Sequence, residues 1–181
     1  MEKVEPIRDR EKIEEMKNEL LKSGFRNYLL FILGINTGLR ISDLLSLKVR
    51  DVKERSHILI KEKKTEKNKR FLINSQLKQE IKRYIKGMTA DDYLFKSQKG
   101  INQPISRVQA YRILKKAGNE LGLESVGTHT LRKTFGYWHY QQYKDVALLQ
   151  ELFNHSAPSI TLDYIGINQD VMDKTIEGFY L

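Results

Sequence analysis

The sequence contains no cysteine. That absence excludes a disulfide scaffold, a thiolate zinc site and a cysteine nucleophile, and it is compatible with a reducing cytoplasm. Only three of the 181 residues are proline and 40% are hydrophobic, so we do not expect a chain that is disordered as a whole. No apolar run approaches the roughly 20 residues of a transmembrane helix, and the N-terminus (MEKVEPIRDRE) is too charged for a secretory signal. We therefore predict a cytoplasmic protein with no membrane partner.

Two further absences concern organisation and chemistry. The chain has no internal repeat and no low-complexity linker, and its length suits one ordinary domain, which we predict to span residues 1–181. It also has no cluster of carboxylates of the kind that two-metal nucleases use. We expect neither a metal ion nor a cofactor.

Positive charge is in excess: 32 Lys and Arg against 23 Asp and Glu give a net charge of +9. A sequence pI near 9.6 favours a polyanionic partner, with nucleic acid first and an anionic membrane surface second. Charge alone does not exclude a basic protein that binds no polyanion.

Apolar periodicity and capping residues predict mostly helix. The expected helices run from the cap Asp9 to Leu21, over 25–36, around 39–47, after Asn74 or Ser75, over 106–121, from a cap at Thr128 or Thr130, over 145–153, from a cap at Ser159, and near the C-terminus. Two β-branched segments, 57–63 and 69–73, flank the polar link KTEKN and predict an antiparallel hairpin. The fold class is therefore mainly α with a small antiparallel β-sheet (α+β).

The hairpin and one helix carry clustered basic residues, which suit a DNA surface as well as a solvated one. In the hairpin these are Lys61, Lys63, Lys64, Lys67, Lys69 and Arg70. On the 106–121 helix they include Arg107 and Arg112. Arg40 is a different case, because it lies between apolar segments. From local sequence it is more simply a surface arginine paired with Asp43 than a phosphate-binding group.

The last quarter of the chain concentrates reactive side chains. His129 and Arg132 are three residues apart, so on a helix they share one face and can cradle a phosphate, although two exposed polar residues would show the same spacing. Asn154 suits the left-handed turn that ends a helix, and it precedes His155. Tyr164 follows nine residues later. A tyrosine packed on an apolar face is the simpler explanation for it, and also for the tyrosines of the YWHYQQY stretch at residues 137–143.

Four segments together resemble the catalytic domain of the tyrosine recombinase (phage integrase) family. They are TGLRISDLLSL, the hairpin KKTEKNKRFLI, THTLRKTF and LFNHSAPSITLDYI, in the family's order and spread over residues 37–165. The resemblance implies that fold and a metal-independent, site-specific recombinase that cleaves and rejoins double-stranded DNA through a 3′-phosphotyrosyl intermediate. A type IB topoisomerase-like enzyme and an inactive DNA-binding module are the alternatives.

The resemblance also implies a role for each matching residue. Tyr164 would be the nucleophile, Arg40 and Arg132 the phosphate clamp, and His129 the general acid/base. His155 would donate a hydrogen bond to the phosphate. Lys64 would protonate the leaving 5′ oxygen, and Asp43 would support Arg40.

Two features depart from the family pattern. Asn154 stands where the family usually has glycine, and asparagine tolerates the same left-handed backbone. The family's N-terminal DNA-clamp domain is expected to be absent, which would weaken DNA binding. Residues 168–181 are expected to form a helical tail through which a homo-oligomer, a tetramer on DNA, would assemble.

Overall fold

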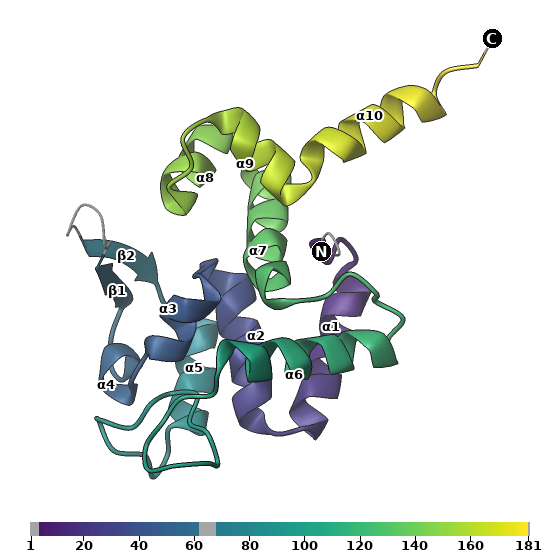
Figure 1. The fold of residues 1–181 in the computed structure, drawn as a ribbon. Helices are drawn as coiled ribbons and strands as arrows, with labels where there is room; N and C mark the ends of the chain where they lie inside the picture. Colours follow the sequence, from purple (N-terminus) through teal and green to yellow (C-terminus); the bar gives the residue numbers. More distant parts are fainter. Residues whose placement is uncertain (1–3, 62–67, 181) are drawn as a thin grey trace.

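The computed structural model describes residues 4–61 and 68–180 (Figure 1). In these residues the helices and strands are α1 (Arg10–Lys22), α2 (Phe25–Thr37), α3 (Ile41–Ser46), α4 (Val49–Val52), β1 (His57–Lys61), β2 (Asn68–Leu72), α5 (Ser75–Tyr84), α6 (Arg107–Glu120), α7 (Thr128–Tyr143), α8 (Val146–Phe153), α9 (Pro158–Ile165) and α10 (Ile167–Glu177). The predicted class, mainly α with a small antiparallel sheet, is confirmed. The short helix α4 was not predicted.

Most helix starts follow the capping residues of the sequence. The side chains of Asp9, Asn74, Ser106 and Asp145 each accept a hydrogen bond from a backbone N–H in the first turn of the helix that follows. Such a cap satisfies an amide that has no partner inside the helix. These contacts are local, which is why the sequence predicts them.

Two predicted caps were wrong. Helix α7 begins after Gly127, and Thr130 instead accepts a hydrogen bond from the Gly127 N–H at 3.0 Å, reaching back from the third helical position. Helix α9 begins after Ala157 rather than Ser159. Pro158 takes the first helical position because its fixed φ suits that place and its missing N–H would have no partner there.

The hairpin is antiparallel as predicted, with Ile58 opposite Phe71. Both of these side chains are buried, so one face of the ribbon packs on the core. Three residues with predicted roles, Lys63, Lys64 and Lys67, lie outside the described residues.

Two hydrophobic clusters divide the molecule. The larger one is built around α2, whose apolar residues are buried on nearly every side. The smaller one holds Leu149, Phe153 and Ile165 where α8 and α9 wrap the far end of α7 (Figure 1). Helix α7 therefore joins the clusters, and its close approach to α2 depends on Gly34, where an added Cβ would lie 2.6 Å from a Leu131 methyl carbon.

The segment before α1 holds the C-terminal half in place. The Ile7 N–H donates to Thr134 Oγ1 at 2.9 Å, and the Trp138 indole N–H donates to the Ile7 carbonyl at 2.9 Å. Arg8 pairs with Asp170 of α10 at 3.2 Å and with Glu5 at 3.0 Å.

Beyond this point α10 extends away from the body of the molecule (Figure 1). Its last turns and the residues after it expose apolar side chains, including Ile176 and Phe179. No helix within the described ranges has both the length and the apolar character needed to cross a membrane.

Candidate active site

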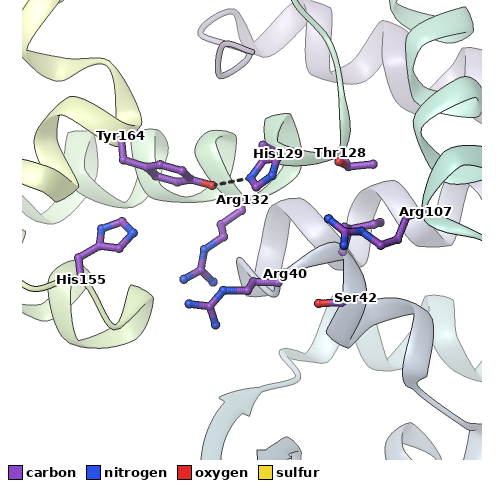
Figure 2. A pocket seen from close by; sticks show the side chains of 9 residues that line it. Arg40, Ser42, Arg107, Thr128, His129, Arg132, His155 and Tyr164 are labelled. Atoms are coloured by element: carbon purple, nitrogen blue, oxygen red, sulfur yellow. Dashed lines mark hydrogen bonds between the residues drawn. The ribbon is translucent and has the colours of Figure 1, made fainter. Parts of the chain in front are cut away.

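Four helices and one turn enclose a pocket of about 160 Å³ (Figure 2). Its lining residues come from the N-terminal ends of α3, α6 and α7, from α9, and from the turn before α9. They are Arg40, Ile41, Ser42, Arg107, Thr128, His129, Arg132, His155 and Tyr164. None of them is acidic, and three are arginines. The N-termini of α6 and α7 add favourable dipole ends, so the pocket suits an anion.

Arg132 is the buried anchor of the pocket, with only 6% of its surface exposed. Its guanidinium donates to the carbonyl of Gly38 and, at 2.9 Å, to the carbonyl of Phe153, and it lies 4.1 Å above the Phe153 ring. Burial, and then the charge of Arg40, lower its pKa to about 10. Arg132 is therefore still charged at neutral pH, in one fixed orientation.

Arg40 joins the same anchor from a distant part of the chain. It occupies the N-cap position of α3, and its guanidinium donates to the Phe153 carbonyl at 3.4 Å. The structure therefore places Arg40 in the pocket, which was the less favoured local interpretation. Two like charges beside one carbonyl repel each other, and an anion bound between them would relieve that repulsion.

Tyr164 points its hydroxyl at His129, with the tyrosine oxygen 3.3 Å from His129 Nδ1 (Figure 2). Burial raises the pKa of Tyr164, although Arg132 and Arg40 act in the opposite direction. Burial, followed by Lys133, Arg107 and Arg132, lowers the pKa of His129. The phenol is therefore protonated at neutral pH, beside a neutral imidazole that can accept its proton.

His155 lies beside Tyr164 in the pocket lining (Figure 2). Asn154 has the predicted left-handed backbone, with φ 55° and ψ 46°, and this turn directs the chain after α8 back across the pocket. The imidazole Nδ1 lies 3.0 Å from Thr161 Oγ1, and the ring meets Tyr164 edge to face at 5.2 Å. Burial and the two arginines, Arg132 and Arg40, lower the pKa of His155.

The other predicted residues are distributed unevenly around the pocket. Arg107, predicted only as a DNA-binding residue, lines the pocket itself. Asp43 does not line it, and no ion pair with Arg40 is recorded in the described part of the chain; its charge raises the pKa of Arg132. Lys69 donates to the Glu151 carbonyl at 2.6 Å.

The remaining predicted basic residues that the structure describes lie outside the pocket lining. Arg70 lies 3.4 Å from the His57 ring, and Lys61 and Arg112 are exposed. Of the described residues that were predicted only to bind DNA, Arg107 alone lines the pocket.

Sequence reasoning missed three parts of the pocket. Ser42 and Thr128 place hydroxyls in its lining, and the Phe153 carbonyl accepts hydrogen bonds from both Arg40 and Arg132. The proximity of these two residues to Arg40 and His129 in the chain was the only available signal for the hydroxyls. Nothing in a sequence marks a backbone carbonyl as an anchor.

A tyrosine, two arginines and two histidines around one pocket of a mainly helical domain define the class of enzymes that break and rejoin DNA through a tyrosine. The chain belongs to the phage integrase family, which it matches over residues 9–170. The resemblance predicted from the four sequence segments is confirmed.

Among curated proteins, the chain is 55% identical over 176 residues to the probable integrase/recombinase YoeC of Bacillus subtilis (strain 168), covering 97% of each chain. It is 29% identical over 170 residues to the tyrosine recombinase XerA of Pyrococcus furiosus, covering 92% of this chain and 59% of that protein. The chain thus spans nearly the whole of one relative and less than two thirds of the other.

Among solved structures, the chain is similar to the XerH site-specific recombinase bound to difH substrate in a pre-cleavage complex. The TM-score is 0.72 at 26% identity, covering 90% of this chain and 51% of that one. Similarity to the XerA recombinase structure, with a TM-score of 0.74 at 20% identity, covers 98% and 67% and shows the shared fold.

Proposed function

We propose that the protein is a site-specific recombinase that cleaves and rejoins double-stranded DNA through a 3′-phosphotyrosyl intermediate. One observation carries the proposal: the Tyr164 hydroxyl shares a single pocket with three guanidiniums and two imidazoles, and none of the described residues that line this pocket is acidic. The names of its relatives, integrase and recombinase, favour strand exchange over DNA relaxation or a module that only binds DNA.

In the proposed reaction the Tyr164 oxygen attacks the scissile phosphorus, and the bond to the 5′ oxygen breaks. His129 takes the phenolic proton, since its Nδ1 lies 3.3 Å from the hydroxyl. Lys64, which is outside the described residues, donates its own ammonium proton to the leaving 5′ oxygen. The phosphotyrosyl ester conserves the bond energy, so reversal of these steps rejoins the strand.

Arg40, Arg132 and His155 would stabilise the charge that develops on the non-bridging oxygens. If His155 Nδ1 accepts a hydrogen bond from the Thr161 hydroxyl, Nε2 carries the proton and can donate to the phosphate. Each such donor is worth about 2.7–4 kcal/mol of barrier. Asp43 supports the clamp through its charge, and no step requires a metal or cofactor.

DNA binding and assembly would use surfaces outside the pocket. Lys61, Lys69 and Arg70 on the hairpin, and Arg112 on α6, would contact backbone phosphates. The exposed apolar residues of α10 would dock on a second protomer and build a tetramer on DNA. That docking is supported by the way α10 projects from the body (Figure 1).

The test is capture of the covalent intermediate. The target site is unknown, so the protein is incubated with a pool of nicked duplexes whose central region is randomised, and DNA that stays attached under denaturing conditions is sequenced. Wild type is expected to form the adduct and Tyr164→Phe to form none. Tyr143→Phe, which alters an exposed tyrosine outside the pocket, is the matched control.

An adduct that survives in Tyr164→Phe would remove the nucleophile assignment. A wild-type protein that forms no adduct with any duplex in the pool would favour the inactive module. With a captured site in hand, exchange between two labelled duplexes separates a recombinase from an enzyme that only relaxes supercoils.

A further inference from the structure

We propose that Arg107, Ser42 and Thr128 form a second phosphate subsite, which holds a phosphate adjacent to the scissile one on the cleaved strand. The subsite rests on the proposed DNA cleavage and deepens it. It would assign a positioning role in the reaction to three residues, two of which have no other assigned function.

The pocket lining falls into two groups of side chains (Figure 2). Tyr164, His155, Arg132 and Arg40 lie toward one side, where the Phe153 carbonyl binds both guanidiniums. Arg107, Ser42 and Thr128 lie toward the other side, and the guanidinium of Arg107 reaches from α6 toward the middle of the pocket. The second group offers one cationic donor and two hydroxyls, the usual partners of a phosphate.

A single phosphate does not need both groups. A phosphodiester has two non-bridging oxygens, and the bidentate donors Arg40 and Arg132, with His155, already supply enough hydrogen bonds for them. The neighbouring phosphate must lie close by, because charges along one strand repeat about every 3.4 Å of helix axis. The second group is therefore placed for the next phosphate rather than for the scissile one.

Arg107 is available for such a ligand. Its side chain is exposed, and neither an ion pair nor a hydrogen bond is recorded for it in the described part of the chain. Its charge acts on His129, which places it near the reacting groups without making it part of the clamp. A phosphate bound there would fix the strand relative to Tyr164, so Arg107 would act by positioning.

The experiment removes each partner singly and together. The duplex captured most often by wild type is synthesised with a neutral methylphosphonate at one or the other phosphate flanking the scissile one. Rates of adduct formation are measured for wild type and Arg107→Ala on all three duplexes. Arg112→Ala, from the same helix but outside the pocket lining, is the matched control.

Loss of one charge-assisted contact is expected to slow adduct formation roughly 10–100-fold. At one of the two flanking positions, the methylphosphonate should slow wild type by that factor and leave Arg107→Ala no slower than it already is. With Arg112→Ala the two effects should multiply. Ser42→Ala and Thr128→Val should show the same coupling, with smaller losses.

Effects that multiply in Arg107→Ala at both flanking positions would overturn the subsite while leaving the proposed cleavage intact. A relaxed sequence preference in Arg107→Ala without phosphate coupling would also overturn it, in favour of base recognition. Failure of wild type to form an adduct on the unmodified duplex would instead contradict the proposed function itself. Thermal melting of each variant shows whether a loss reflects unfolding.

Discussion

Gly136 lies where α7 crosses α8 and α9, and Gly136→Ala should disturb the active site more than the fold. An added Cβ would lie 2.7 Å from Ile165 Cγ2 and 2.8 Å from two carbons of the Phe153 ring. Ordinary carbon contacts are about 3.5–4.0 Å, so these buried neighbours must retreat by roughly 0.7 Å or more. Ile165 follows Tyr164 directly, and the Phe153 carbonyl orients both clamp arginines.

The two consequences differ in size. Overpacking costs about 1–3 kcal/mol, and the better helix propensity of alanine returns about 1 kcal/mol, so the net loss of stability is about 0–2 kcal/mol. That corresponds to a fall in Tm of at most several degrees. Misplacing reacting groups by about 1 Å can cost about 100-fold in rate, and we expect adduct formation to fall about 10–100-fold.

The assay compares Tm and the rate of adduct formation on a single-site nicked duplex, well below the Tm of the variant. Gly178→Ala, whose added methyl meets only the Lys174 carbonyl at 3.8 Å, is the control and should leave both values unchanged. If Gly136→Ala lowers Tm but forms the adduct at the wild-type rate, packing at this crossing does not set the position of Tyr164.

Three other outcomes are expected. Burial lowers the pKa of His129, His139 and His155 below the ordinary 6.5, so the unfolded chain binds more protons there. Stability should therefore be full above about pH 6.5 and fall as the pH drops below it, by up to about 1.4 kcal/mol per pH unit per histidine; a Tm independent of pH from 7.5 to 5.5 would contradict this. Sulfate should raise the Tm above its value in chloride of equal ionic strength. At a sulfate concentration tenfold above the Kd, the free energy of unfolding should increase by about 1.4 kcal/mol. Equal Tm values in the two salts would argue against an anion site between the arginines. Arg8→Ala should cost about 1 kcal/mol and speed amide exchange in α10, because Arg8 pairs with Asp170, whereas Lys12→Ala, which removes only a pair with Glu15 inside α1, should leave α10 exchange unchanged.

The sequence alone determined what depends on local contacts. The caps of α1, α5, α6 and α8 involve groups two or three residues apart, so residue type and position predict them. The reactive residues were also recognisable, because four short segments carry them in a specific order. At the starts of α7 and α9 the predicted caps were wrong, because the residues that occupy the N-cap positions, Gly127 and Ala157, have no side-chain acceptor for a local pattern to recognise.

The tertiary structure decided how those residues are held and which others join them. Arg132 donates to Gly38, 94 residues away, and Arg40 donates to Phe153, 113 residues away. Arg107 enters the pocket only because α6, which begins at this residue, packs against α3 and α7. Residue types specify which contacts a side chain is able to make, but contacts over such separations form only when helices pack, and packing depends on the whole core at once.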